Sequence, residues 1–162
     1  MRIDADNADR FADIEIAAEQ REFVTDARTL IRRHLETGYA EALYGIEAGG
    51  APAGLLALLP PELGIDYPEA RSDEAWLEGF RIDARFQGQG VAGKALTGIA
   101  TLAARRYARL SLTVNLRNDK AEAAYRRFGF RDTGALYHGG PAGPQRILTL
   151  DLNEGGADGE GA

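Results

Sequence analysis

The chain of 162 residues has no cysteine, one tryptophan and two histidines. Without cysteine it can form no disulfide, no thiolate metal site and no cysteine nucleophile. His34 and His138 stand alone without the spacing of metal ligands, so we expect no metal. Serine is equally scarce, and Ser72 and Ser111 leave few candidates for a covalent acyl-enzyme.

Long hydrophobic runs are also missing. The longest, Leu55–Leu59, is far shorter than the roughly 20 apolar residues of a membrane span. The first ten residues are polar and acidic, unlike a secretory signal. We therefore expect a cytoplasmic protein with no membrane partner. Its length predicts a single domain, which we place at residues 1–152. Residues 153–162 are rich in glycine and acids, and we expect them to form a flexible tail.

Charge is unevenly distributed along the chain, whose net charge is −6. Residues 84–131 contain ten Lys and Arg side chains, opposed only by Asp119 and Glu122. Two interpretations stay open: solvated helix faces, or an anionic cofactor on the basic part and a cationic substrate near the acidic part. An acidic chain without a basic stripe interleaved with aromatics argues against nucleic acid.

Hydrophobic periodicity predicts a mixed α/β (α+β) fold. Antiparallel strands are expected at both ends, with a β-α-β unit between them. The predicted elements are an edge strand at 1–4, helices at 6–14, 17–23 and 25–35, strands at 41–48 and 53–59 around a turn at 49–52, a loop at 60–74, a strand at 75–82, a helix at 90–107, a strand at 109–115, a helix at 118–128, and strands at 131–137 and 146–152.

A glycine-rich turn lies between a predicted strand and a predicted helix. Such a turn points backbone N–H groups at a phosphate. Residues 88–93 spell G-x-G-x-x-G, the dinucleotide-binding pattern, but that pattern expects an acid about 20 residues later. Residues 104–118 contain none, so a dinucleotide is disfavoured.

The same turn can be parsed from Gln87 to Ala92 as Q-x-x-G-x-A. A second motif follows after the next strand, N-x-x-A-x-x-x-Y-x-x-x-G-F over residues 118–130. Together they resemble the GNAT superfamily of N-acetyltransferases, which implies a GNAT-type, mostly antiparallel sheet flanked by helices around a central β-α-β acetyl-CoA-binding unit. The runs EQREFVTDARTL, GFRIDARFQGQG and RILTLDL resemble its spermine/spermidine acetyltransferase branch. Two departures are Ala92, where many members have glycine, and the long loop at 60–74.

The resemblance implies a set of residues that bind acetyl-CoA. The central strand would separate from its neighbour after Ile82, and the backbone there would hold the pantetheine and the thioester carbonyl. Asn118 would cap its helix and also touch the cofactor. The expected cofactor-binding residues are Phe80, Arg81, Ile82, Gln87, Gly88, Gln89, Gly90, Val91, Ala92, Asn118 and Tyr125.

Two residues are the catalytic candidates. Tyr125 would protonate the departing CoA thiolate, although its place on an apolar stripe also suits a core tyrosine. Glu78 lies mid-strand among apolar residues and would act as general base through a water, unless it faces solvent. Six more acids could form a wider acidic mouth or a solvated surface: Glu41, Glu62, Asp66, Glu69, Asp73 and Glu74.

The resemblance implies a metal-free N-acetyltransferase. It would transfer an acetyl group from acetyl-CoA to a primary amine of a small molecule, a polyamine above all, by direct attack in a ternary complex. Two alternatives remain: transfer to another amine (an amino acid, an aminoglycoside-type compound or a protein N-terminus), and a non-catalytic acyl-CoA-binding module. The oligomeric state stays open, with a homodimer as one candidate.

Overall fold

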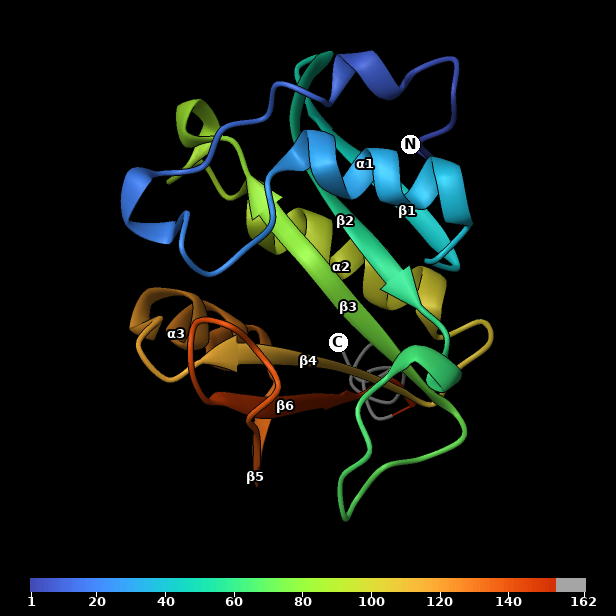
Figure 1. Ribbon diagram of the computed structural model, residues 1–162, viewed down its shortest axis with the longest axis vertical. Coiled ribbons are helices and arrows are strands. Elements are labelled where there is room, and N and C mark those ends of the chain that lie inside the picture. Colours follow the sequence, from blue (N-terminus) through green and yellow to red (C-terminus); the bar gives the residue numbers. More distant parts are fainter. Residues whose placement is uncertain (154–162) are drawn as a thin grey trace, which may run out of the picture. The chain divides into compact units, whose positions relative to one another are not determined.

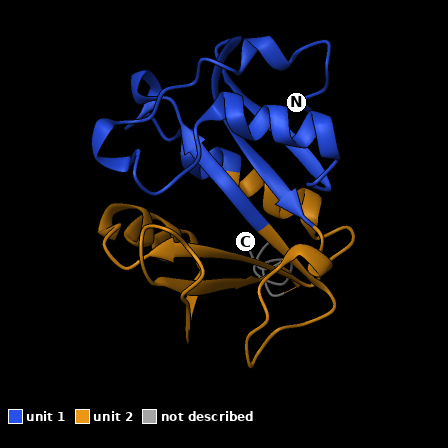
Figure 2. Ribbon diagram, in the orientation of Figure 1, with its two compact units in different colours: residues 1–59, 77–95 blue, residues 60–76, 96–162 orange. Residues whose placement is uncertain are grey.

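The computed structural model describes residues 1–153, which form two compact units (Figure 2). Unit 1 comprises Met1–Leu59 and Leu77–Ala95, and unit 2 comprises Pro60–Trp76 and residues 96–153. The chain therefore passes from one unit to the other three times. From residue 154 onward, the expected tail lies outside the described residues. The single domain expected over residues 1–152 stays a prediction.

Six strands are hydrogen-bonded in the order β1-β2-β3-β4-β6-β5. The β3–β4 pair is parallel, whereas β1–β2, β4–β6 and β5–β6 are antiparallel. The mixed sheet, its three helices and the β3–α2–β4 unit confirm the predicted fold class (Figure 1). The elements are β1 (Ala42–Ala48), β2 (Ala51–Leu59), β3 (Glu74–Ile82), β4 (Arg109–Asn115), β5 (Arg131–Tyr137), β6 (Gln145–Asp151), α1 (Ala27–Thr37), α2 (Val91–Ala103) and α3 (Asp119–Phe128).

Unit 1 is built on the β1–β2 hairpin and helix α1. The hairpin turn is tighter than expected, because Ala51 already pairs with Ala48 in the strand ladder. Helix α1 begins at Asp26, whose carboxylate accepts a hydrogen bond from the Thr29 N–H at 2.9 Å. The completely buried Phe11 ring covers Gly45 of β1, where a Cβ would lie only 2.3 Å from the ring.

The prediction of helices at 6–14 and 17–23 is wrong. Short 3₁₀ helices stand there instead, at Ala8–Arg10 and Ala18–Gln20. The side chain of Asp4 accepts hydrogen bonds from the Asp6 and Asn7 N–H groups, a local arrangement that competes with a helix. The second segment buries no residue, so no packing stabilises a longer helix.

Unit 2 packs its core around β4 and β6. Leu110, Leu112, Ile147 and Leu148 are at most 2% exposed. Helix α3 begins after the N-cap Asn118, as the sequence predicted.

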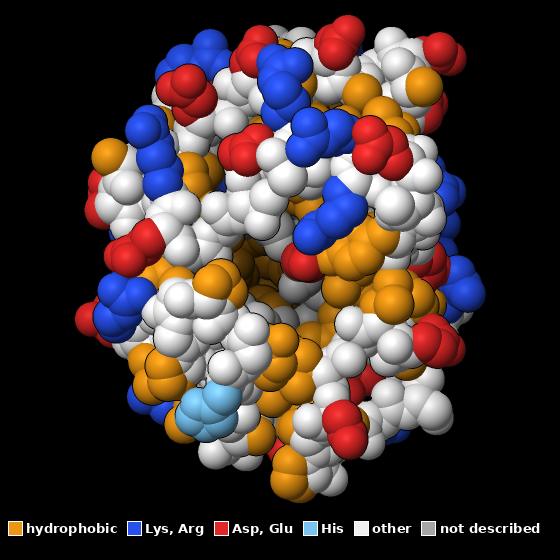
Figure 3. Space-filling model, viewed as in Figure 1, with side chains coloured by type: hydrophobic (Ala, Val, Ile, Leu, Met, Phe, Trp, Pro, Cys, Tyr) orange, Lys and Arg blue, Asp and Glu red, His pale blue; other side chains and the backbone are white. Residues whose placement is uncertain are grey.

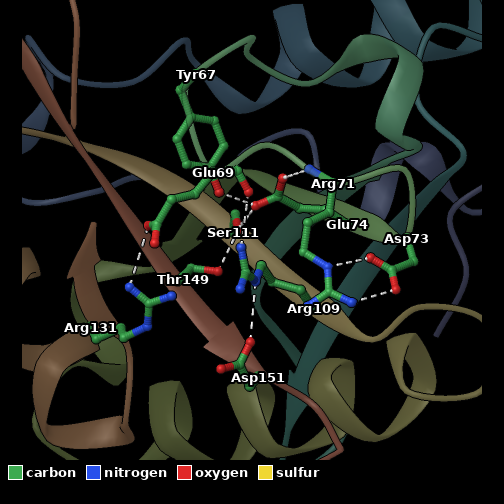
Figure 4. Close-up of polar contacts among 10 residues, drawn as sticks. All are labelled: Tyr67, Glu69, Arg71, Asp73, Glu74, Arg109, Ser111, Arg131, Thr149 and Asp151. Atoms are coloured by element: carbon green, nitrogen blue, oxygen red, sulfur yellow. Dashed lines mark hydrogen bonds and ion pairs between the residues drawn. The ribbon is translucent and has the colours of Figure 1, made fainter. Parts of the chain in front are cut away.

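A cluster of buried polar side chains fixes the 60–73 loop to the sheet of unit 2 (Figure 4). Glu74, which begins β3, is 1% exposed. Its Oε1 accepts from the hydroxyls of Tyr67, at 2.5 Å, and Ser111, and its Oε2 accepts from the Arg71 N–H at 3.1 Å. Ser111 and Thr149 share a further hydrogen bond of 2.8 Å. We call these five residues the Glu74 cluster; every oxygen of its carboxylate has a donor.

The cluster changes the interpretation of the acidic loop. Because Glu74 is buried, it cannot belong to the acidic mouth considered above, and that hypothesis is wrong for this residue. Two neighbouring acids have internal partners as well. Asp73 forms a two-pronged ion pair with Arg71 at 2.7 Å, and Glu69 lies 3.5 Å from Arg131 (Figure 4).

Candidate functional site

The glycine-rich turn leads directly into α2 and is open to solvent. Gly88 and Gly90 have φ angles of 76° and 77°, in the left-handed region that glycine adopts without strain. A Cβ on either would meet no atom within 4 Å, so no neighbouring group crowds either glycine. The first N–H groups of a helix have no acceptor within the helix. Residues 88–92 thus present what a phosphate requires.

Asp83 holds this turn in place. It is 2% exposed and accepts hydrogen bonds from the Arg85 N–H and Nε, both at 2.9 Å, and from the Glu15 N–H at 3.1 Å. Burial alone would raise the pKa of Asp83, but the bonds from Arg85 and Glu15 outweigh it and hold the pKa below its usual value. The Arg85 side chain is therefore bound to Asp83, the residue that holds the turn.

Strand β3 changes its surroundings along its length. Its pairing with β4 covers three residue pairs and ends at Trp76, well before the Ile82 at which the resemblance placed the separation. Gly79, with φ 65°, then breaks the regular strand geometry. Beyond it lie Phe80, Arg81 and Ile82, the segment expected to bind the thioester end of the cofactor. The Ile82 carbonyl accepts a hydrogen bond from Gln87 Nε2 at 3.4 Å, which links this segment to the glycine turn.

Glu78 lies beside Gly79, and its side chain is 37% exposed. Its Oε1 lies 3.5 Å from Arg33 NH2, while its buried Oε2 has no hydrogen-bond partner among the described residues. Burial raises the pKa of Glu78, and the charges of Arg33 and Arg81 act against that rise. A half-buried carboxylate with a raised pKa and an unused oxygen is suited to accept a proton.

Arg81 is held rigidly next to this carboxylate. Only 5% exposed, it donates from Nε to the Gly79 carbonyl at 2.9 Å and from NH1 to the Thr25 carbonyl. Burial lowers the pKa of Arg81 to about 10, so the side chain remains a cation at neutral pH. Its role as seen here is to fix the chain before α1 and to keep positive charge near Glu78.

Asn118 and Tyr125 are the predicted site residues of unit 2. The Asn118 side chain accepts from the Ala121 N–H at 3.4 Å, the expected cap of α3. The Tyr125 ring meets the Phe130 ring edge-on, with centroids 5.7 Å apart. Burial raises the pKa of Tyr125 above its usual value, so its hydroxyl stays protonated at neutral pH.

The structure thus places the predicted residues in two groups. Glu78, the segment 80–82 and the turn 87–92 belong to unit 1, whereas Asn118 and Tyr125 belong to unit 2. Within residues 1–153, no three His, Cys, Asp or Glu side chains gather as metal ligands would. None of the helices described in that range is long and apolar enough to cross a membrane.

Part of the basic stretch at 84–131 is paired with acids. Several of its arginines have acidic partners within their own unit. Acidic and basic side chains are interspersed on the face shown in Figure 3. The paired arginines are Arg85 with Asp83, Arg109 with Asp151, Arg126 with Glu122 and Asp132, and Arg131 with Glu69.

Reasoning from the sequence missed Arg33 and Tyr39. The Arg33 guanidinium lies 4.2 Å from the Tyr39 ring centroid and also reaches Glu78. No local signal marks this contact, because α1 and β3 are far apart in the chain. Helix α1 approaches β3 closely at Gly79, where a Cβ would lie 2.7 Å from the Leu30 side chain.

Comparison with known proteins identifies relatives of the chain. Residues 8–130 match the model of the acetyltransferase (GNAT) family. A spermine/spermidine N(1)-acetyltransferase of Bacillus subtilis (strain 168) is 30% identical over 153 residues, which cover 91% of this chain and 93% of the relative.

Solved structures agree on the fold. An aminoglycoside acetyltransferase, AAC(6')-Ib, in complex with coenzyme A has a TM-score of 0.73 at 14% identity, covering 93% of this chain and 92% of that one. A chimera of spermidine N-acetyltransferase SpeG from Vibrio cholerae and hSSAT has a TM-score of 0.69 at 16% identity, covering 95% of each chain.

Proposed function

The chain belongs to the acetyltransferase (GNAT) family, and from this premise we propose that it transfers an acetyl group from acetyl-CoA to a primary amine of a small molecule. A polyamine such as spermidine or spermine is the proposed substrate class. It is supported by two relatives, a spermine/spermidine N(1)-acetyltransferase at 30% identity and a protein named as a probable spermine N(1)-acetyltransferase at 29%. The proposed reaction is direct attack of the amine in a ternary complex.

The proposed acetyl-CoA contacts come from the backbone. The N–H groups of residues 88–92 would hold the pyrophosphate, an assignment supported by the open turn with Gly88 and Gly90 in the left-handed region. The backbone of 80–82 would hold the pantetheine and the thioester carbonyl. An N–H there would stabilise the oxyanion of the tetrahedral intermediate. Asn118 would contribute beside its capping role.

Glu78 is the proposed general base, acting through a water. An alkylamine resembles lysine and is mostly protonated at neutral pH, so it must lose a proton before it attacks. The observation that carries this assignment is the unpartnered, buried Oε2 of a carboxylate whose pKa is raised by burial.

Tyr125 is the proposed general acid. Its hydroxyl would protonate the CoA thiolate as the tetrahedral intermediate collapses. The support for this role is the place of Tyr125 in the 118–130 motif; its phenol is protonated at neutral pH, as a general acid must be, and burial makes it a weaker acid than a free tyrosine.

An amine panel tests the proposal. The protein would be mixed with acetyl-CoA and spermine, spermidine, an amino acid, an aminoglycoside or a peptide, and the released CoA thiol followed with a thiol reagent. Because the chain has no cysteine, the protein gives no background signal. We expect polyamines to give the highest kcat/KM. Measurable binding of acetyl-CoA without thiol release for any amine would sink the enzyme proposal and leave a non-catalytic module.

A further inference from the structure

Arg33 forms an ion pair with Glu78, the carboxylate proposed as the general base. The two side chains come from α1 and β3, both within unit 1, with NH2 and Oε1 3.5 Å apart. The same guanidinium lies over the Tyr39 ring at 4.2 Å from its centroid. Both side chains keep contact with solvent, at 41% exposed for Arg33 and 37% for Glu78. A ligand from solution can therefore reach this place.

The Arg33–Glu78 pair is poorly satisfied. Arginine and carboxylate frequently meet through two parallel hydrogen bonds of about 2.7–2.9 Å. Here the contact is longer and single. The buried Arg33 Nε and the buried Glu78 Oε2 are both without a hydrogen-bond partner among residues 1–153. Exposed ion pairs of this kind contribute little to stability. Arg33 is thus held loosely where it lies.

The groups that hold Arg33 are those that bind a primary ammonium. A carboxylate accepts its N–H donors, and the face of a tyrosine attracts its charge. An ammonium presents three donors, enough to engage the Glu78 oxygen that Arg33 leaves unused. We propose that Glu78 and Tyr39 form a subsite for a primary alkylammonium, and that Arg33 is a place-holder which the substrate's amine displaces. This inference rests on the proposed function.

The second cation near Glu78 cannot act in the same way. Arg81 is 5% exposed, and two of its nitrogens donate to the carbonyls of Gly79 and Thr25, while its NH2 has no hydrogen-bond partner among residues 1–153. It stays in place whichever cation occupies the subsite. Arg33 stands on the surface of α1 and has no such anchors among the hydrogen bonds of the described residues. Of these two arginines, Arg33 is the one that can leave.

The test is the affinity for spermidine measured by calorimetry at pH 8, without acetyl-CoA. Arg33→Ala removes the competitor, so we expect the dissociation constant to fall about 3- to 10-fold. Arg33→Lys should lie between Ala and the wild type. In turnover the same gain should appear in KM for the amine, with KM for acetyl-CoA unchanged. Unchanged or weaker binding by Arg33→Ala, or no binding by either protein, overturns the inference.

Two controls separate the subsite from a general charge effect. Arg28→Ala removes one positive charge from the same helix, where Arg28 pairs with the exposed Asp13 at 2.6 Å, and should leave the affinity for spermidine within twofold. In a Glu78→Gln background the gain from Arg33→Ala should disappear, because the contested carboxylate is gone. A gain that persists there, or an equal gain in Arg28→Ala, contradicts the place-holder.

Failure of the proposed function gives a different pattern. If spermidine binds more tightly to Arg33→Ala but no CoA thiol is released, the subsite stands and catalysis is refuted. If thiol is released but Arg33→Ala binds no tighter, catalysis stands and the place-holder is refuted.

Discussion

Glu74 and Glu78 lie on the same strand, yet their surroundings are opposite. Glu74 is 1% exposed, and both its oxygens accept hydrogen bonds within unit 2. Glu78 is partly exposed in unit 1, with one long ion pair and one oxygen that has no partner among the described residues. A fully satisfied carboxylate holds structure together, whereas an incompletely satisfied one is available to a ligand. Substitutions at the two glutamates and at the tyrosines near each proposed role test this contrast.

Glu78→Gln should have the largest effect on catalysis. Loss of the general base should lower kcat/KM for the amine about 100- to 10,000-fold. Stability should not fall, because the lost ion pair is long and burial disfavours the charged form of Glu78 in the folded protein. Steady-state kinetics and urea unfolding measure the two quantities. Full activity in this variant would remove Glu78 from the mechanism.

Tyr125→Phe should have the second-largest effect on catalysis, and Tyr67→Phe provides the matched control. The first should lower kcat about 100-fold with KM for acetyl-CoA nearly unchanged. Tyr67 has its pKa raised to about 12 by burial and by its hydrogen bond to Glu74, and it donates within the Glu74 cluster. Its loss should reduce stability by about 1 kcal/mol and spare kcat. Equal kcat values for Tyr125→Phe and the wild type would exclude the acid role.

Glu74→Gln should show the reverse of Glu78→Gln. The substitution places an amide where the Tyr67 and Ser111 hydroxyls donate to a carboxylate oxygen. The weaker hydrogen bonds should destabilise the protein by about 1–3 kcal/mol. The free energy of unfolding from urea titration measures this loss. We expect kcat to fall by less than tenfold in the folded protein. A loss of activity as large as that of Glu78→Gln would erase the distinction between the two glutamates.

The pH dependence should report Glu78 with a definite sign. Because folding raises its pKa, the folded protein binds more protons between the ordinary value of about 4.3 and the raised value, so stability from this group falls as pH rises through that window. Activity moves the other way, since kcat/KM rises as Glu78 ionises. The rise of kcat/KM with pH should vanish in Glu78→Gln. In Arg33→Ala it should shift to higher pH, because the charge of Arg33 lowers the pKa of Glu78. A rise that stays in Glu78→Gln belongs to another group.

The sequence predicted the parts that depend on local chemistry. Strand β4 occupies Arg109–Asn115 as expected, and Asn118 caps α3, because alternation and capping are local signals. The glycine turn and the 118–130 motif also pointed to the family. What escaped prediction are contacts between distant residues. An acid at the end of an acidic loop suggests a solvated charge, and only Ser111, 37 residues away, makes Glu74 a core residue. Arg33 likewise reaches Glu78 only through packing of α1 on β3.

The most direct test of the account is the mass of spermidine after incubation with the protein and acetyl-CoA. We predict that spermidine gains one acetyl group as free CoA appears, and that Glu78→Gln abolishes most of this product while Glu74→Gln retains it. Unmodified spermidine beside intact acetyl-CoA, in the presence of a protein shown to bind acetyl-CoA, would contradict the account.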